Sequence, residues 1–279
     1  MRGWWQEITG LVLPVDCAGC GRWRTVLCEE CREALSGRPA RRVWPDPVPA
    51  GLPSVHAAAS YGDAVRSVLL AHKERGALTL AGPLGEALAG AVRAAVESGE
   101  RGGEGAGAGW VGGGGGPPVL LVPVPSARRA VAARGHDPGL RIALAAARVL
   151  RRSGLPVRTA AVLRQRRFVA DQVGLDARRR QANVFEALGV VRGGERLLRK
   201  QGVVRPVVLV DDLLTTGASL TEATRAVSGA GGLLLGAAVV AAVERAPLER
   251  APRKSGTAEE RRSFLMETAG KHLNGGTPR

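Results

Sequence analysis

One stretch of the sequence decides the fold: Val207-Val-Leu-Val-Asp-Asp-Leu-Leu-Thr-Thr-Gly-Ala-Ser219. Its first four residues form a short apolar run, which is typical of a strand buried on both faces of a sheet. Asp211 and Asp212 follow at once, and the small residues 215–219 then open a helix predicted over 219–229. A buried strand, a turn of small residues and a helix in this order indicate one unit of a parallel α/β sheet.

The same stretch carries the chemistry of a phosphate site beside a diol site. Backbone N–H groups converge at a helix N-terminus, where the helix dipole favours an anion, and Thr and Ser hydroxyls add donors. Asp211 and Asp212 cannot bind that anion, but they can accept hydrogen bonds from vicinal hydroxyls. A phosphate beside a diol describes a ribose 5-phosphate. The motifs of a Walker A loop and of a dinucleotide-binding turn are absent after this strand, and a chance strand–turn–helix is the alternative.

Apolar runs alternate with amphipathic stretches through the second half of the chain. The predicted strands of this half are 119–122, 157–163, 207–210 and 234–243, and its predicted helices are 140–151, 178–187 and 219–229. Two further helices, 64–73 and 78–96, are predicted before the glycine-rich loop. Buried strands alternating with helices predict an α/β fold with a mostly parallel, doubly wound sheet. Such sheets bind ligands at the carboxyl ends of their strands.

The composition divides the chain into four predicted segments. Residues 1–38 contain a short apolar helix at 4–13 and a cysteine knuckle, and residues 39–60 form a proline-rich connector. Residues 61–246 form the α/β domain, with a flexible glycine-rich loop at 97–118. Residues 247–279 are predicted to be a disordered tail, because they are polar and lose periodicity.

All four cysteines lie near the N-terminus, as Cys17-x-x-Cys20 and Cys28-x-x-Cys31. Two CxxC pairs supply the tetrahedral set of sulfur ligands that zinc prefers. Two disulfides are the alternative, but nothing in the sequence indicates an oxidising compartment. We therefore predict a structural zinc site, whose metal would provide most of the folding energy of the knuckle.

The positive charge of the chain is concentrated in one segment. The formal net charge is +15, and residues 148–205 hold 15 basic and 4 acidic residues, so this segment is expected to face anions. No run reaches 18 uninterrupted apolar residues, and residues 1–16 lack a basic leader and a small-residue cleavage site. We expect a soluble, cytoplasmic protein without membrane insertion.

The 207–219 stretch resembles the 5-phosphoribosyl 1-pyrophosphate (PRPP) motif of type I phosphoribosyltransferases. Other motifs, in the same order, resemble the ComF family, competence-associated relatives of those transferases that also begin with a four-cysteine knuckle. These motifs are Tyr61-Gly62 to Lys73, Val122-Pro-Val-Pro125, Arg134-Gly-His-Asp137, Leu163-Arg-Gln-Arg166, Ala170-Asp-Gln172 and Arg180-Gln-Ala-Asn183. The resemblance covers about residues 4–245 without the glycine-rich loop, and it implies a doubly wound sheet of the type I phosphoribosyltransferase kind.

The resemblance also implies a role for each matching residue. Asp211 and Asp212 would hold the ribose hydroxyls, and Thr215, Thr216, Gly217, Ala218 and Ser219 the 5-phosphate. The diphosphate would bind at the turn of Val124, Pro125 and Ser126, with Arg128 or Arg134 nearby. Lys73 would lie within reach of it. The alternative is that Lys73 is a solvated cation at a helix end. Residues 164–183 resemble a mobile hood, whose polar contacts are Arg164, Arg166, Gln172 and Arg180. Mg²⁺ would bridge diphosphate and ribose oxygens.

The expected reaction is the displacement of pyrophosphate from C1 by a nitrogen nucleophile on an unknown nucleobase or amine. His136 and Asp137 stand where the family more often has Phe-Asn, which bears on acceptor recognition. The alternative function is an accessory role in DNA uptake, with single-stranded DNA or the competence machinery as partner and the PRPP pocket regulatory or vestigial. Against it, the basic segment contains only Phe168 and Phe185 as aromatic residues. A purely structural zinc-linked scaffold leaves Asp211 and Asp212 unexplained.

Overall fold

The computed structural model describes residues 16–102, 116–166, 186–200 and 202–243. Several predictions fall outside these residues: the helix at 4–13, most of the glycine-rich loop, nearly all of the helix at 178–187, and the tail at 247–279. Gln172 and Arg180, two of the predicted hood contacts, also lie outside the described residues.

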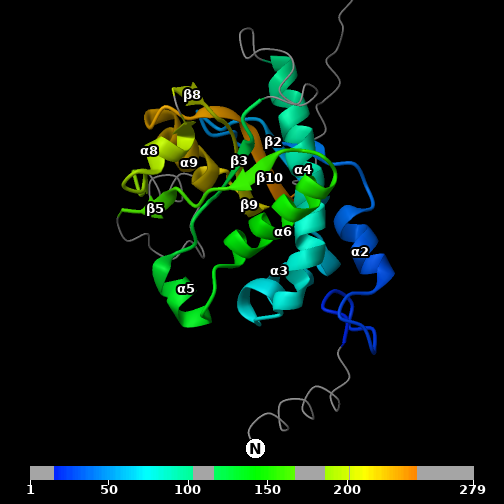
Figure 1. Cartoon of the computed structure of the whole chain (residues 1–279). Coiled ribbons are helices and arrows are strands. Elements are labelled where there is room, and N and C mark those ends of the chain that lie inside the picture. Colours follow the sequence, from blue (N-terminus) through cyan, green and yellow to red (C-terminus); the bar gives the residue numbers. More distant parts are fainter. Residues whose placement is uncertain (1–15, 103–115, 167–185, 201, 244–279) are drawn as a thin grey trace, which may run out of the picture. The chain divides into compact units, whose positions relative to one another are not determined.

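A six-stranded sheet forms the centre of the fold, with the strand order β1-β2-β10-β9-β3-β4 (Figure 1). β1 pairs with β2 in the antiparallel sense, and every other neighbouring pair is parallel. The mixed α/β class and the mostly parallel sheet are therefore confirmed. The strands of this sheet are β1 (Arg41–Val43), β2 (Val55–Ser60), β3 (Val119–Pro123), β4 (Val157–Thr159), β9 (Pro206–Leu214) and β10 (Leu233–Ala242).

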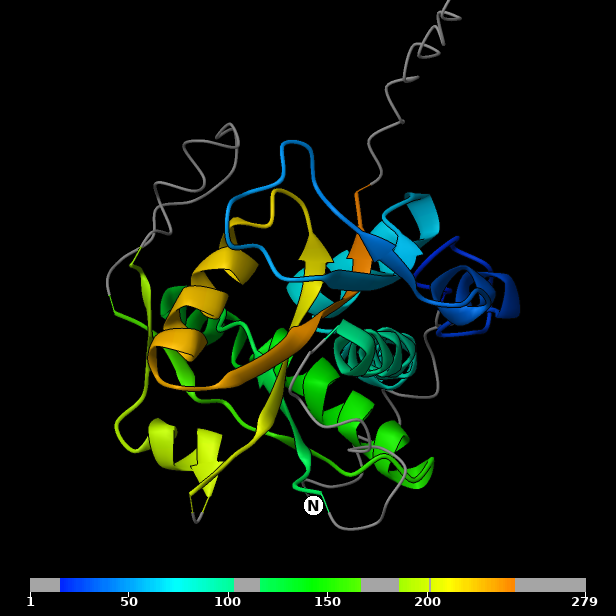
Figure 2. The same ribbon diagram turned by 90° about the horizontal axis from the view of Figure 1, so that it is seen from above.

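Helices cover both faces of the sheet (Figure 2). The alternating residues of β9 show this directly, because Val208 and Val210 belong to one buried cluster and Val207 and Leu209 to another. The first cluster contains residues of α3 (Asp63–Glu74), α4 (Ala81–Gly102) and α6 (Pro138–Arg152), and the second contains residues of α9 (Ala218–Gly229). The run of apolar residues before Asp211 is thus a strand buried on both faces, as its pattern predicts.

The remaining described elements are short. They are α2 (Glu29–Ser36), the 3-10 helix η1 (Leu78–Leu80), α5 (Arg128–Arg134), β5 (Leu163–Gln165), β6 (Leu188–Val190), α8 (Gly194–Leu198), β7 (Arg199–Lys200) and β8 (Val203–Val204). The helix predicted over 78–96 is therefore η1 followed by α4. Among the described helices, none combines the length and the hydropathy that a bilayer crossing requires.

Two predicted strands differ from the structure. The strand predicted over 157–163 is two strands: β4 in the central sheet, and β5, which pairs with β6 in a separate hairpin. The chain turns between them, since Val162 N–H donates to Ala160 O at 2.9 Å. The strand predicted over 207–210 continues to Leu214, because β10 pairs with it along its whole length. Asp211 and Asp212 therefore lie within β9 rather than after it.

The proline-rich connector contributes two strands that its composition does not indicate. β1 and β2 lie within residues 39–60, and β2 is an inner strand that pairs in parallel with β10. Its sequence, Val55-His-Ala-Ala-Ala-Ser60, is short and rich in alanine, so its apolar signal is weak. It becomes a strand because β10 offers it a long buried edge. His56 is buried in this strand, as a packing residue rather than on the surface.

Candidate functional site

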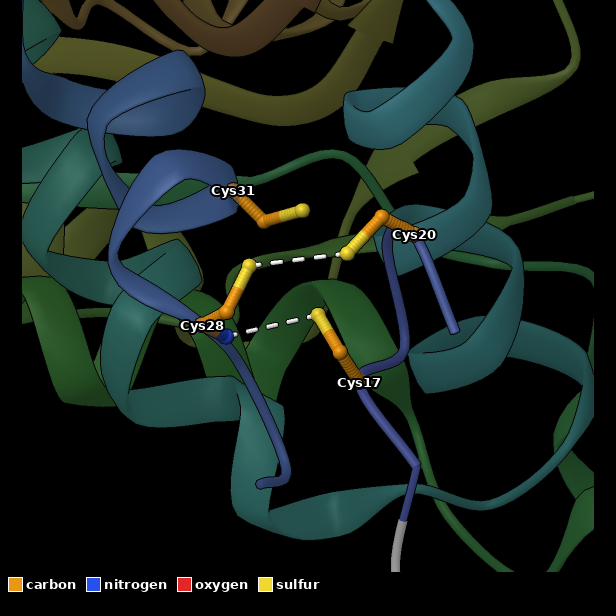
Figure 3. Close-up of side chains that lie close together, drawn as sticks. All are labelled: Cys17, Cys20, Cys28 and Cys31. Atoms are coloured by element: carbon orange, nitrogen blue, oxygen red, sulfur yellow. Dashed lines mark hydrogen bonds between the residues drawn. The ribbon is translucent and has the colours of Figure 1, made fainter. Parts of the chain in front are cut away.

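The four cysteines come together where the knuckle meets α2 (Figure 3). Their Sγ atoms all lie within 4.8 Å of one another, and the Sγ atoms of Cys20 and Cys28 are 3.5 Å apart. Zn–S bonds of about 2.3 Å in a tetrahedron place the sulfur atoms about 3.8 Å from one another. All four are free cysteines, with Cys20 exposed and the other three buried. The four sulfur atoms and their spacing fit a tetrahedral zinc ion. The prediction that the four cysteines lie close enough together to hold a metal ion is therefore confirmed.

The backbone of the knuckle favours thiolate at one of these positions. Burial opposes the ionisation of Cys17, but backbone N–H groups of Cys20, Cys28 and Gly19 lower its pKa to about 6. One of these bonds, from Cys28 N–H to Cys17 Sγ, is 3.3 Å long. Gly19 is required by close approach, because a Cβ at this position would lie 2.5 Å from Cys31 Sγ.

The knuckle is not an isolated appendage. Cys17, Cys28, Cys31 and Leu35 belong to the same buried cluster as residues of α3 and α4. The cysteine site is therefore packed against α3, the helix that carries Lys73 near its last turn.

A second cluster lies on β9, opposite the C-terminal end of α3. Lys73 Nζ lies 2.7 Å from Asp212 Oδ2, and the two side chains are 37% and 14% exposed. Asp211 is half-buried, and its Oδ1 accepts a hydrogen bond from Asp212 N–H at 2.9 Å. The structure thus brings together three of the residues that the sequence selects, although Lys73 and Asp212 are far apart in the chain.

Burial and neighbouring charges set the ionisation of this cluster. Burial, with the added repulsion of Asp212, raises the pKa of Asp211 well above its ordinary value. Burial disfavours the charged form of Lys73, but the attraction of Asp212 outweighs it and raises the pKa of Lys73. The cluster therefore holds a stable cation beside two carboxyl groups, one of which resists ionisation.

The predicted phosphate turn stands at the N-terminus of α9. Gly217 is the N-cap residue with a φ of +76°, a conformation that glycine adopts most easily. Ala218 is buried, Thr216 and Ser219 are half-buried, and Thr215 is exposed. A Cβ on Gly217 would lie 3.0 Å from Leu52 and 3.4 Å from Pro45, so the loop of residues 44–53 packs over this turn. The sequence gives no signal for that contact.

The predicted diphosphate turn follows β3. Val124 N–H donates to Val210 O at 2.9 Å, so this amide is committed to the sheet beside Asp211. Pro123 and Pro125 carry no N–H, and the backbone donors of the turn therefore begin at Ser126. Ser126 Oγ lies 3.4 Å from Asp137 Oδ1, and this carboxylate also caps α6 by accepting from Leu140 N–H at 3.1 Å.

Arg134 is held near Lys73 by Glu74, a residue that the sequence motifs do not include. Its Nε and Nη2 atoms donate to the two carboxylate oxygens of Glu74, at 3.0 and 2.8 Å. Consecutive residues at the end of α3 thus hold Asp212 and Arg134. Arg128, the other predicted cation of this turn, is exposed at the start of α5. Glu74 gives no sequence signal, since Arg134 lies 60 residues further along the chain.

The two described hood arginines lie on the β5–β6 hairpin. Arg164 and Arg166 are exposed, Arg166 N–H donates to Ala187 O at 2.8 Å, and the Arg166 side chain covers Gly189. These contacts lie within the hairpin, so the role of both arginines in the hood stays a prediction.

An ion pair on α9 between buried Glu222 and exposed Arg225, which the sequence pattern did not single out, anchors this hairpin. Glu222 Oε1 accepts from Leu188 N–H at 3.0 Å, and Arg225 Nη2 donates to Leu188 O at 3.0 Å. Arg225 and Glu222 also bind each other at 2.7 Å. The spacing of three residues is a recognisable helix pair, but its backbone partner on β6 is not readable from sequence.

His72, on α3 next to Lys73, is a buried packing residue. Its ring nitrogens face Ala77 O at 3.3 Å and Pro138 O at 3.4 Å, and burial lowers its pKa. The His136 ring lies 6.1 Å from the His72 ring, between centroids.

A comparison with protein-family models found no model that matches this chain, and a comparison with curated proteins found no match either.

Gly19→Ala is expected to weaken zinc binding by about 10–100-fold, the range for changes that displace the support of a metal ligand. The physical reason is that the added methyl group would lie 2.5 Å from Cys31 Sγ. Competition with a chromophoric chelator measures the affinity. Gly62→Ala is the matched control, since among the described residues nothing lies within 4 Å of a Cβ there. An unchanged affinity in Gly19→Ala would contradict the four-sulfur site.

Asp211→Asn is expected to raise the Tm at pH 8, because it removes a carboxyl group whose ionisation is opposed by burial and by the charge of Asp212. The pKa of Asp211 in the folded chain lies above its ordinary value of 3.8. A carboxyl group of this kind costs stability at every pH above the unfolded value, and the cost disappears below it. The gain should therefore shrink toward zero as the pH falls to about 4. Thermal unfolding between pH 4 and pH 8 tests this, with exposed Asp63→Asn as control; a lower Tm for Asp211→Asn at pH 8 would contradict it.

Proposed function

We propose that this chain binds PRPP with Mg²⁺ and transfers its phosphoribosyl group to a nitrogen nucleophile, in the manner of the ComF-like transferases that its motifs resemble. The acceptor is an unidentified nucleobase or amine. The proposal joins the motif order in the sequence to the arrangement of charges at the carboxyl ends of β3 and β9.

One observation carries the proposal: two adjacent carboxyl groups on β9 meet a lysine from α3, shortly before the N-terminus of α9. Buried carboxylates without a function are costly, and the raised pKa of Asp211 is a sign of that cost. The first turn of α9, with Gly217 at its N-cap, offers backbone N–H groups to a phosphate. A ligand with hydroxyl groups at one end and a phosphate at the other matches this pair of sites.

The chain's own residues would then divide the ligand among them. The carboxyl groups of Asp211 and Asp212 accept hydrogen bonds from the 2- and 3-hydroxyls, while residues 215–219 hold the 5-phosphate. Lys73, Arg134 and the Ser126 amide face the diphosphate. A bound Mg²⁺, as a hard cation, would supply further charge neutralisation of the diphosphate.

The reaction balances without an oxidant or reductant. The nitrogen lone pair of the acceptor forms a bond to C1 as the bond from C1 to the diphosphate oxygen breaks, and the diphosphate leaves with that electron pair. The acceptor proton passes to water or to the departing diphosphate. The rate gain comes from holding the two reactants in line and from stabilising the charge that develops on the leaving group.

A second candidate function is favoured by one surface feature. Trp23 is 71% exposed at the tip of the cysteine knuckle, and the exposed Arg22 and Arg24 flank it. An aromatic ring beside cations suits a stacked base and its phosphate, so the knuckle adds a stacking group to the two phenylalanines of the basic segment. We propose single-stranded DNA binding at this tip as the alternative to transfer.

Mg²⁺ and PRPP together are expected to raise the Tm of the wild-type chain. At a ligand concentration of 100 times Kd, the free energy of unfolding rises by about 2.7 kcal/mol. The Asp211→Asn/Asp212→Asn pair should lose this gain, because it removes both negative charges and replaces two acceptor oxygens with NH₂ donors. Asp63→Asn should keep it. Differential scanning fluorimetry measures binding, and pyrophosphate release over a panel of bases and amines measures transfer. If PRPP leaves the wild-type Tm unchanged, the proposal fails.

Trp23→Ala is expected to weaken binding of a single-stranded oligonucleotide by about 1–3 kcal/mol, the value of one base stacked on an aromatic ring. Filter binding over a series of salt concentrations measures it. Trp44→Ala is the matched control, since Trp44 is 66% exposed in another part of the chain. Equal affinities of the wild type and Trp23→Ala would remove the alternative.

A further inference from the structure

The ion pair of Lys73 with Asp212 has a consequence for the choice of ligand. Lys73 Nζ occupies Asp212 Oδ2 at 2.7 Å, on the carboxylate that would accept sugar hydroxyls. The pair joins α3 to β9 across 139 residues of sequence and is only partly open to solvent. A ligand whose hydroxyls bind both oxygens of Asp212 therefore competes with the lysine for Oδ2.

A displaced lysine finds its neighbouring carboxylates engaged. Asp211, whose charge also attracts Lys73, would accept sugar hydroxyls in the complex. Glu74, the residue after Lys73, is already bound by Nε and Nη2 of Arg134, at 3.0 and 2.8 Å. The charge of Arg134 lies near enough to oppose the charge of Lys73. A partly buried cation that loses its partner costs free energy, so displacement is unfavourable unless the ligand itself supplies an anion.

Two ligands differ in whether they supply that anion. Ribose 5-phosphate carries one phosphate, which the N-terminus of α9 would take, and it leaves Lys73 without a partner. PRPP carries a diphosphate on C1, next to the hydroxyls that displace the lysine. Only the second ligand gives Lys73 a new anion close to the place where it loses the old one.

We propose that Lys73 determines specificity, by making the hydroxyl site of Asp212 available only to a sugar phosphate that also carries a diphosphate at C1. This inference rests on the proposed function and deepens it. In the ligand-free chain Lys73 forms an ion pair with Asp212, and in the complex the same side chain binds the diphosphate. The selection against ribose 5-phosphate, which lacks the leaving group, is thereby built into one ion pair.

Lys73→Met tests the inference, because it removes the charge and keeps an unbranched apolar stem. Affinities for Mg²⁺ with PRPP and for ribose 5-phosphate, measured by titration calorimetry, should change in opposite directions. We expect PRPP to bind roughly ten- to a hundredfold more weakly, the range for one lost hydrogen bond to a charged group, and ribose 5-phosphate to bind more tightly. Lys73→Arg keeps the charge and should keep the wild-type preference. Arg66→Gln, which removes an exposed cation from the same helix, should change neither affinity.

Asp212→Asn separates this role from a general effect on the pocket. It removes the negative charge and replaces one acceptor oxygen with an NH₂ donor, and it is expected to weaken both ligands. A second measurement needs no variant: Mg²⁺ with inorganic pyrophosphate should tighten the binding of ribose 5-phosphate to the wild-type chain, because the pyrophosphate gives Lys73 an anion.

The outcomes distinguish the two levels of the argument. A wild-type chain that does not bind PRPP with Mg²⁺ removes the proposed function. A wild-type chain that binds PRPP, with Lys73→Met shifting both ligands in the same direction, overturns the specificity role and leaves the function standing. If Lys73→Met does not fold, the absence of any pyrophosphate effect on ribose 5-phosphate binding to the wild type overturns the role in its place.

Discussion

The ion pair between Lys73 and Asp212 is the contact on which the arrangement of the site depends. It fixes the C-terminal end of α3 against the strand that carries both carboxyl groups. Glu74, the next residue of α3, holds Arg134 in turn, so one helix end positions both cations of the site. The other side of this helix packs in the cluster that contains the cysteines. A metal in the knuckle would therefore stabilise the same helix that places Lys73.

The packing of the sheet offsets the free energy that it costs to bring these charged groups together. β9 is buried on both faces, with α4 and α6 packed on one side and α9 on the other, so its backbone is held rigidly. Moving a charged group from water into such a strand costs desolvation free energy, and the raised pKa of Asp211 reflects that cost. The apolar layers around the strand compensate for it. The carboxyl groups lie in a region of lower dielectric constant than water. Hydrogen bonds that they accept are electrostatically stronger there than in water.

Local patterns predicted much of the fold and part of the site. The buried run at 207–210, the helix after Gly217 and the paired CxxC motifs were all readable, because each is encoded by neighbouring residues. The strand β2 was not, since its alanine-rich sequence becomes a strand only beside β10. The break between β4 and β5 was also missed, because a single turn at Ala160 redirects an otherwise continuous apolar run. Arg164 and Arg166 were selected by motif, yet their described contacts remain within their own hairpin.

The sequence by itself determined the α/β class, the four-sulfur cluster, and the pairing of two acids with a small-residue turn. Spacing along the chain is sufficient for these, because strand period, helix capping and ligand geometry act over a few residues. Only the tertiary structure decided that Lys73 binds Asp212 and that Glu74 binds Arg134. The same is true of the 44–53 loop that covers Gly217, and of the hydrogen bonds that the Leu188 backbone makes with Glu222 and Arg225. These contacts join distant segments, and their geometry depends on strand order, register and helix packing, which no local pattern contains.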